Sequence, residues 1–206
     1  WLQSKNATSF LSCSTDGQVI IWDTRYLAEP PKECYQLQLS PEKAEGSAYL
    51  GVLGGESIDY DPMYSATKFM IGSEQGVVIS CTRRKNKPIQ LDKAYFGHHG
   101  PIYALQRNPF NPKYFLSIGD WTAKIWNEEM SNPIITTAYD TTYLTDGCWS
   151  NSRPGVFFTT KMDGSLDIWD ILYRQNKPVL SVSVSDAELQ SISCKDGKHI
   201  VVGATD

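Results

Sequence analysis

The sequence predicts an all-β protein built from repeated antiparallel sheets. Four segments of the 206-residue chain share a polar turn followed by an apolar strand: STDGQVIIWD (14–23), SEQGVVISCT (73–82), IGDWTAKIWN (118–127) and KMDGSLDIWD (161–170). Their corresponding residues Trp22, Cys81, Trp126 and Trp169 lie 59, 45 and 43 residues apart. A repeat of roughly 40 to 45 residues is typical of a four-stranded unit, so the longer first interval indicates an insertion.

The third repeat shows the expected strand order most clearly. Gly97-His98 opens it, apolar runs follow at 102–105, 114–118 and 123–126, and 133–139 is predicted as the outer strand. The same reading gives strands in the other repeats at 10–13, 19–22, 34–39, 57–61, 68–72, 77–81, 145–150, 156–160, 166–169, 179–184 and 199–202. Asp16-Gly17 is predicted to form a type I′ hairpin turn. The ungapped alignment places Trp121 where the other repeats have the turn glycine.

These landmarks predict a WD40 β-propeller, because Gly-His near the start of such a period and Trp-Asp at its end form the WD40 signature. The repeats fall at about 1–45, 46–96, 97–142, 143–185 and 186–206. A seven-blade ring needs roughly 300 residues. We therefore expect a partial propeller, with parts of about five blades of a larger ring.

Composition argues against several classes of partner. The chain has 19 basic and 23 acidic residues, a net charge of −4, so a nucleic-acid partner is not expected. No apolar run approaches the roughly 20 residues of a membrane span, and no leader-like segment precedes Trp1. The five cysteines show no CxxC spacing, and we expect them to be reduced, buried and intracellular.

No motif in the chain predicts chemistry. A glycine-rich phosphate loop, a GxSxG elbow, an HExxH motif and paired Cys/His spacing are all missing from the sequence, so no catalytic residue, cofactor or metal site is predicted. His98 with Asp120 could be read as a catalytic pair. The structural interpretation is favoured, because the aspartate sits in a hairpin turn that most repeats share.

The residues that recur at matching positions of the repeats are expected to be structural. His98, Ser117, Asp120 and Trp126 stand where WD40 blades place a buried hydrogen-bonded set that runs from the Trp indole through a hydroxyl and the histidine to the turn aspartate. The matching residues in the neighbouring repeats are Asp16, Trp22, Asp163 and Trp169. We expect the three tryptophans to be core anchors.

A second group of residues is predicted to contact partners. Trp121 replaces a turn glycine and is expected to be exposed, either as a contact residue or packed on the next blade. Arg83, Arg84 and Lys85 belong to a basic loop at 83–87, whose simpler reading is a solvated turn. Arg25 follows the first Trp-Asp pair.

Four segments of the chain closely resemble one subfamily, the WD-repeat intermediate chains of axonemal outer-arm dynein, of the intermediate chain 2 type. The resemblance is carried by FMIGSEQGVVISC (69–81), GHHGPIYALQRNPFNPK (97–113), GDWTAKIW (119–126) and FFTTKMDGSLDIWD (157–170). The Gly-Asp-Trp-Thr turn resembles dynein intermediate chains in general. These segments spread over most of the chain.

The resemblance implies a non-catalytic scaffold subunit, with ATP hydrolysis left to the heavy chain. Implied partners are the tail of a dynein heavy chain and a second intermediate chain, with light chains and doublet microtubules as parts of the same complex. Implied locations are the axoneme of cilia or flagella and, before assembly, the cytoplasm. The alternative is a substrate receptor of a cullin-type ubiquitin ligase, because Trp22-Asp23-Thr24-Arg25 resembles the WDxR adaptor-binding motif of such receptors.

Overall fold

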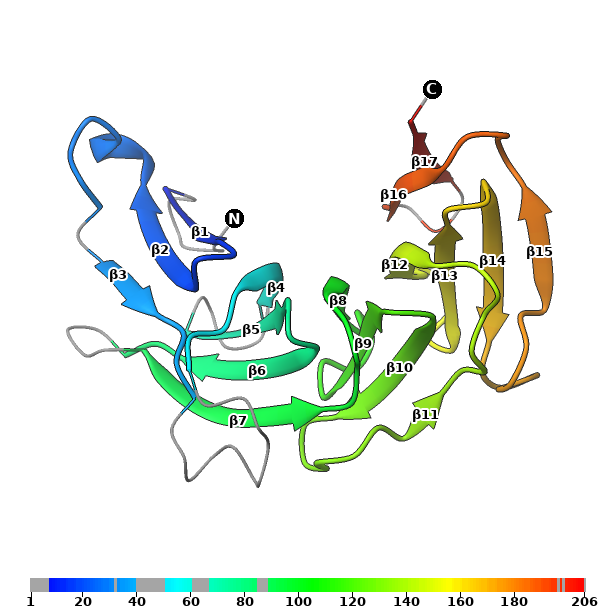
Figure 1. Ribbon diagram of the computed structural model, residues 1–206, viewed down its shortest axis with the longest axis horizontal. Coiled ribbons are helices and arrows are strands. Elements are labelled where there is room, and N and C mark those ends of the chain that lie inside the picture. Colours follow the sequence, from blue (N-terminus) through cyan, green and yellow to red (C-terminus); the bar gives the residue numbers. More distant parts are fainter. Residues whose placement is uncertain are drawn as a thin grey trace. The chain divides into compact units, whose positions relative to one another are not determined.

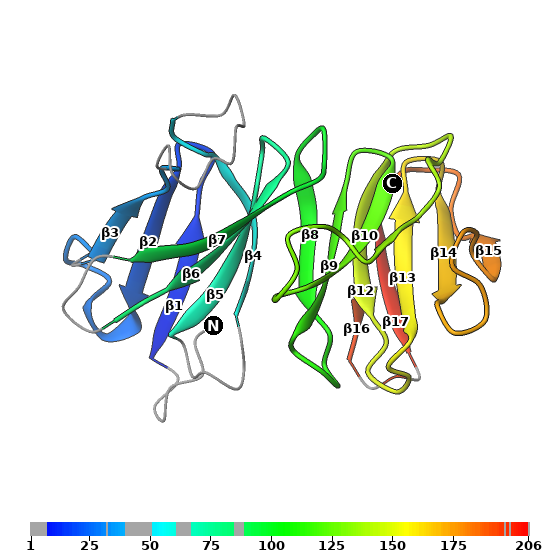
Figure 2. The same ribbon diagram turned by 90° about the horizontal axis from the view of Figure 1, so that it is seen from below.

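The computed structural model describes residues 8–31, 33–39, 51–60, 67–84, 89–195, 197 and 199–205. They form two compact units, Trp1–Ile102 and Tyr103–Asp206. The strands of each sheet run side by side in antiparallel directions (Figure 1, Figure 2). The predicted strand end at Trp1-Leu2, most of the insertion and Lys85 lie outside the described residues. Within the ranges described, no helix is long and apolar enough to span a membrane.

The first unit contains two sheets. The three-stranded sheet has the order β1-β2-β3 and the four-stranded sheet the order β4-β5-β6-β7. The strands are β1 (Ser9–Cys13), β2 (Gln18–Asp23), β3 (Glu33–Gln36), β4 (Gly55–Tyr60), β5 (Lys68–Ser73), β6 (Val77–Thr82) and β7 (Gln90–Phe96). A 3-10 turn, Thr24–Tyr26, follows β2.

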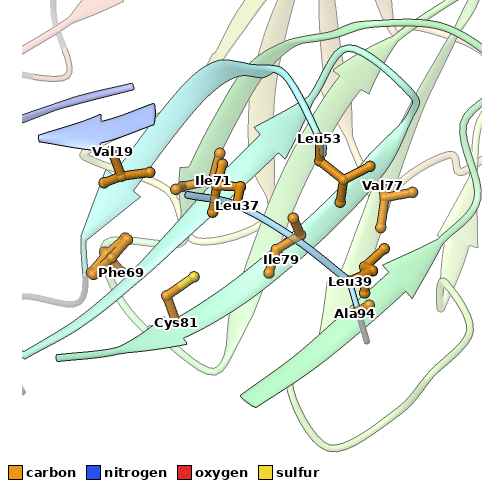
Figure 3. Close-up of a cluster of buried hydrophobic side chains, with 10 residues drawn as sticks. All are labelled: Val19, Leu37, Leu39, Leu53, Phe69, Ile71, Val77, Ile79, Cys81 and Ala94. Atoms are coloured by element: carbon orange, nitrogen blue, oxygen red, sulfur yellow. The ribbon is translucent and has the colours of Figure 1, made fainter. Parts of the chain in front are cut away.

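The core of the first unit lies between these two sheets. Ten buried residues form one cluster, which takes Val19 from β2, Phe69 and Ile71 from β5, and Ile79 and Cys81 from β6 (Figure 3). Cys81 is fully buried, so the position that carries tryptophan in other repeats holds a smaller apolar side chain here.

The second unit contains two four-stranded sheets and one hairpin, with the orders β11-β10-β9-β8, β12-β13-β14-β15 and β16-β17. Its strands are β8 (Ile102–Arg107, which starts at the unit boundary), β9 (Tyr114–Gly119), β10 (Thr122–Asn127), β11 (Ile135–Thr136), β12 (Leu144–Trp149), β13 (Val156–Lys161), β14 (Ser165–Asp170), β15 (Leu180–Ser183), β16 (Leu189–Cys194) and β17 (Ile200–Ala204). Buried side chains fill the space between consecutive sheets. One cluster includes Leu116, Trp149 and Phe157, and a second includes Phe158 and Leu189.

The predicted fold class, a partial WD40 propeller, is confirmed: each repeat forms an antiparallel sheet of the expected strand order. Two outer strands differ from prediction. Strand β11 pairs with β10 over only two residues, Ile135 and Thr136, of the predicted 133–139 segment. In β15 the apolar side chains Leu180 and Val182 are exposed, so its alternation with serine does not mark a buried face. Strands β7 and β16 were not predicted.

The predicted type I′ turn is wrong. Only the glycine of each turn has a positive φ, at 80° in Gly17, 81° in Gly76 and 80° in Gly164. The N–H of Gly17 donates to the carbonyl of Ser14 at 2.9 Å, and Ser14 N–H donates to Gln18 at 3.1 Å. This is a type I turn followed by a left-handed glycine, the common three-residue hairpin loop.

The third repeat turns differently. Thr122 pairs with Gly119, so only Asp120 and Trp121 form the loop, and the left-handed residue is Asp120 with φ 54°. The ungapped alignment is therefore wrong by one residue at this turn. Trp121 does not occupy the glycine position, which explains why a bulky residue is tolerated there.

Candidate functional site

Each tryptophan of the Trp-Asp type donates its indole N–H to a hydroxyl on the neighbouring strand. Trp22 bonds Ser12 at 2.8 Å, Trp126 bonds Ser117 at 2.8 Å, and Trp169 bonds Thr159 at 3.1 Å. Such a bond satisfies a buried N–H that would cost about 1–3 kcal/mol if left without a partner. The tryptophans therefore join β2 to β1, β10 to β9 and β14 to β13.

Burial separates the first tryptophan from the other two. Trp126 and Trp169 are 0% and 4% exposed. Trp22 is only half-buried, stacked on Phe10 at 6.0 Å. Among the described residues of the first unit, a single sheet packs on β1-β2-β3. Trp22 is thus less buried than Trp126 and Trp169 among the described residues, and its role as a core anchor stays a prediction.

The turn aspartates fix the hairpins. The carboxylate of Asp16 accepts the N–H of Gln18 at 3.0 Å, and that of Asp163 accepts the N–H of Ser165 at 3.0 Å. Asp120 is 2% exposed and accepts both the N–H and the hydroxyl of Thr122, at 2.9 and 2.8 Å. A carboxylate that caps the backbone two residues on is a turn device, so the geometry gives these aspartates a structural task.

His98 is 6% exposed and belongs to the first unit, whereas Ser117, Asp120 and Trp126 belong to the second. Its place in a buried set with those three residues stays a prediction. No further role of His98 is needed to explain the turn or the indole bond described above.

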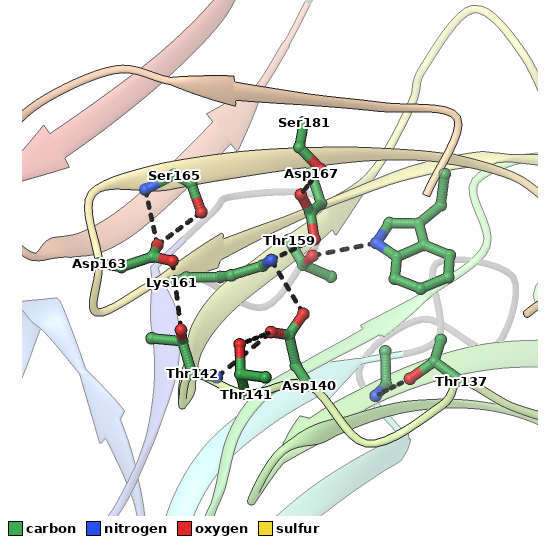
Figure 4. Close-up of polar contacts among 12 residues, drawn as sticks. Thr137, Asp140, Thr141, Thr142, Thr159, Lys161, Asp163, Ser165, Asp167 and Ser181 are labelled. Atoms are coloured by element: carbon green, nitrogen blue, oxygen red, sulfur yellow. Dashed lines mark hydrogen bonds and ion pairs between the residues drawn. The ribbon is translucent and has the colours of Figure 1, made fainter. Parts of the chain in front are cut away.

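Sequence reasoning missed a buried ionic set in the β12-β13-β14-β15 sheet. The ammonium of Lys161 lies 2.9 Å from Asp140 and 2.7 Å from Asp167, and Ser181 donates to Asp167 at 2.5 Å (Figure 4). Lys161 and Asp167 are 8% and 0% exposed. A signal existed, because Asp140 precedes its strand much as His98 precedes β8.

The ionic set shifts the protonation of its members. Burial by itself lowers the pKa of Lys161, but hydrogen bonds to Asp167 and Asp140 outweigh burial and raise that pKa. Burial by itself raises the pKa of Asp140, but the hydrogen bond from Lys161 and the Thr142 N–H together lower it. Both groups are therefore held in their charged forms inside the sheet.

Trp149, which was also missed, links two sheets of the second unit. Its indole N–H donates to the carbonyl of Gln106 at 3.1 Å, and its backbone N–H donates to the Gln106 side chain at 2.7 Å. It is 1% exposed and packs edge-on against Phe157. Gln106 and Trp149 stand on the first strands of successive sheets, β8 and β12, which places them opposite each other.

Trp121 is exposed, as predicted for a contact residue, and it belongs to an aromatic row. It is 44% exposed and meets Tyr143 edge-on at 5.0 Å, while Tyr143 meets Tyr103 at 5.8 Å. Burial, helped by the neighbouring Tyr103, raises the pKa of Tyr143 to about 12. Contact with a partner is not shown by this exposure and stays a proposal.

Two predicted contact arginines line one depression of about 290 Å³ in the first unit. Arg25 reaches Asp23 at 2.9 and 2.6 Å, and Arg83 makes a two-pronged pair with Glu33 at 2.9 and 2.8 Å. The hydrogen bond from Arg83 lowers the pKa of Glu33. Arg83 thus ties β6 to β3, so it is not a purely solvated loop residue. Arg84 is exposed.

The described residues offer no obvious centre for metal chemistry. No group of three or more His, Cys, Asp or Glu side chains among them could hold a metal ion. None of the five cysteines forms a disulfide bond in the part of the chain that the structure describes, and Cys81 and Cys148 are buried as expected. Cys34 is exposed, because it lies on the outer strand β3, so the expectation of burial is wrong for it.

Comparison with known proteins identifies a family. Residues 38–198 match the family described as "Dynein axonemal intermediate chain 3 WD40 domain", and residues 3–23 match "WD domain, G-beta repeat". The chain is 48% identical to "Dynein, 70 kDa intermediate chain, flagellar outer arm" of Chlamydomonas reinhardtii, over 100% of this chain and 36% of that protein.

Two further relatives agree. The chain is 50% identical to "Dynein intermediate chain 3, ciliary" of Heliocidaris crassispina, over 99% of this chain and 34% of the relative. It is 48% identical to "Dynein axonemal intermediate chain 2" of Homo sapiens, over 98% of this chain and 33% of the relative. The chain thus spans about a third of the length of these relatives.

Proposed function

The chain belongs to the axonemal dynein intermediate chains, and on that premise we propose that it acts as a non-catalytic scaffold of the outer dynein arm. In this role it binds the tail of a dynein heavy chain and a second intermediate chain. Light chains and doublet microtubules are parts of the same complex. The protein works in the axoneme of a cilium or flagellum and passes through the cytoplasm before assembly.

One observation carries the proposal. Relatives that are 48–50% identical over 98–100% of this chain bear the names of flagellar outer-arm, ciliary and axonemal dynein intermediate chains. The structural tasks of Asp16, Asp120 and Asp163 in their turns support a scaffold, since they leave these carboxylates engaged in holding backbone.

Candidate contact residues lie on exposed turns of both units. We place Trp121 among them because it is a large exposed aromatic in a hairpin loop, the type of residue that dominates interface energies. Arg25, Arg83 and Arg84 are weaker candidates. The first two already have carboxylate partners, so a protein partner must compete with those partners or add to them.

The test is an affinity pulldown of the complete protein from ciliated or flagellated cells, followed by mass spectrometry of what remains bound at low salt. Dynein heavy chains together with a second WD-repeat intermediate chain are expected. Recovery of ubiquitin-ligase subunits without dynein would overturn the proposal and favour the reading of Trp22-Asp23-Thr24-Arg25 as an adaptor motif. Loss of the ligase adaptor in an Arg25→Ala variant, which removes that motif, would support the adaptor reading.

A further inference from the structure

One end of the sheets in the second unit carries an exposed aromatic patch, which consists of Trp121, Tyr143, Tyr103 and Met162. Trp121, Tyr103 and Met162 are 44%, 42% and 42% exposed. Tyr103, Tyr143 and Met162 line a depression of about 340 Å³ together with Thr145 and Gln190. Exposed aromatic side chains that surround a hollow are a common form of binding surface.

The strand order explains why these side chains gather. Trp121 lies in the loop between β9 and β10, and Met162 in the loop between β13 and β14. Tyr143 precedes β12, and Tyr103 is near the start of β8. Because neighbouring strands are antiparallel, loops between second and third strands lie at the same end as the starts of first strands. The loops between first and second strands and between third and fourth strands lie at the opposite end.

Charge is distributed unequally between these two ends. The patch end of the second unit carries the carboxylates of Asp140, Asp163, Asp186 and Glu188 in its loops. The described basic side chains near this end are buried beside carboxylates. Lys161 is 8% exposed and lies between Asp140 and Asp167, and Lys124 is 7% exposed and interacts with Asp120. The exposed basic side chains of the described part of this unit lie in loops at the opposite end: Lys113, Arg153, Arg174, Lys177 and Lys195.

Aromatic rings next to exposed carboxylates, here Asp163, Asp186 and Glu188, favour a cationic ligand. Lysine and arginine are attracted to the faces of tryptophan and tyrosine, and surrounding carboxylates steer such groups to the surface and select against acidic competitors. The same carboxylates repel phosphate, which disfavours nucleic acid. We propose that the patch end of the second unit docks a lysine- or arginine-bearing segment of a partner polypeptide. This rests on the proposed scaffold function and specifies the chemistry of one partner.

The first experiment measures binding of a fluorescent peptide of alternating arginine and leucine to the complete protein, by anisotropy at low and high salt. The matched peptide has glutamate in place of arginine. The arginine peptide should bind, and its affinity should fall as salt rises. The double variant Trp121→Ala, Tyr103→Ala should lower this affinity about tenfold or more. The control is Tyr173→Ala, which removes a 74% exposed ring from the opposite end, and it should bind as the parent does.

A charge variant keeps the test independent of the aromatic side chains. Asp186→Lys with Glu188→Lys reverses two exposed charges at the patch end, whereas Glu129→Lys reverses one at the opposite end. The first variant should lose affinity and salt dependence, and the second should not. Equal binding of both peptides, unchanged binding by both patch variants, or equal loss in the controls would each overturn the proposal.

The pulldown described above separates this proposal from the scaffold function. If the patch variants of the complete protein still recover the dynein heavy chain and the second intermediate chain in full, the scaffold function stands and the patch is not a required docking surface. If the peptide binds as expected but no dynein subunit is recovered from the parent protein, the scaffold function fails. Patch variants that change self-association without changing peptide binding would assign the surface to a second copy and overturn the proposal.

Discussion

The β11-β10-β9-β8 sheet and the β12-β13-β14-β15 sheet share one framework. In each, a tryptophan donates to a hydroxyl of the neighbouring strand, and it stacks on a phenylalanine at an interplanar angle of 5°. The stacked pairs are Phe115 with Trp126 and Phe157 with Trp169. The two sheets therefore share the same phenylalanine–tryptophan stacking and the same indole hydrogen bond.

They differ in their turns and in their buried polar groups. The first sheet turns in two residues on a left-handed Asp120, and the second uses the left-handed Gly164. The second also buries a lysine between two carboxylates. The two sheets therefore share the contacts that join adjacent strands, but they differ in the polar side chains that they bury.

Removing the ionic set of Lys161, Asp140 and Asp167 should have the largest effect on stability. Lys161→Met leaves Asp167, which is 0% exposed, without its cation and should lower the free energy of unfolding by about 3–5 kcal/mol in urea denaturation. The control, Lys113→Met, removes an exposed pair with Glu129 and should cost about 0–1 kcal/mol. Equal losses in the two variants would mean that the buried set does not distinguish the sheets.

The pH dependence of the stability difference between the parent and Lys161→Met tests whether the charges of the ionic set cause that difference. Because the pKa of Asp140 is lowered on folding, its contribution is present above the unfolded value of about 3.9 and is lost as pH falls through the folded pKa. Because the pKa of Lys161 is raised, its contribution is present below about 10.4 and is lost as pH rises through the folded pKa.

The stability difference between the parent and Lys161→Met should therefore be largest between about pH 4 and pH 10 and shrink on both sides. Urea denaturation of both proteins from about pH 2 to about pH 12, which extends beyond this range on both sides, measures it. A difference that is constant with pH would show that the loss comes from packing of the lysine stem and not from its charge.

The turns give a smaller effect. A Cβ on Gly164 would lie 1.9 Å from the carbonyl oxygen of Ser185 and would also require a left-handed alanine. Gly164→Ala should cost about 1–3 kcal/mol or more. Trp121→Gly should leave stability within about 0.5 kcal/mol, because the residue is exposed and is not the left-handed one. Thermal unfolding of both variants measures the two losses of stability. A larger loss for Trp121→Gly than for Gly164→Ala would contradict the assignment of the left-handed residue in each turn.

The indole bonds should give the smallest difference between the sheets, because both have them. Ser117→Ala and Thr159→Ala each leave a buried indole N–H without a hydroxyl partner, at a cost of about 1–3 kcal/mol. The cost of Thr159→Ala should exceed that of Ser117→Ala by only about 1 kcal/mol, because it also removes one buried methyl group. Urea denaturation of both variants checks this, and a large inequality would contradict the shared framework.

Most strands could be predicted from the sequence, because strand position depends on local apolar runs bounded by turn residues. The boundaries of β5, β6, β9 and β13 agree with prediction to within one residue. Outer strands were harder. Strand β11 is limited to Ile135–Thr136, and nothing in the local sequence of 133–139 states how much of it finds a partner on β10.

The sequence by itself determined the repeat, the tryptophan positions and the turn aspartates, since each rests on residues close together in the chain. Tertiary structure alone decided that Trp121 is not at a glycine position, because that depends on the register of Thr122 with Gly119. It also decided the Lys161 ion set, the Gln106–Trp149 link and the row from Trp121 to Tyr103. Their members come from different strands and loops, and only the stacking of sheets brings such distant residues within hydrogen-bond or ring-contact distance.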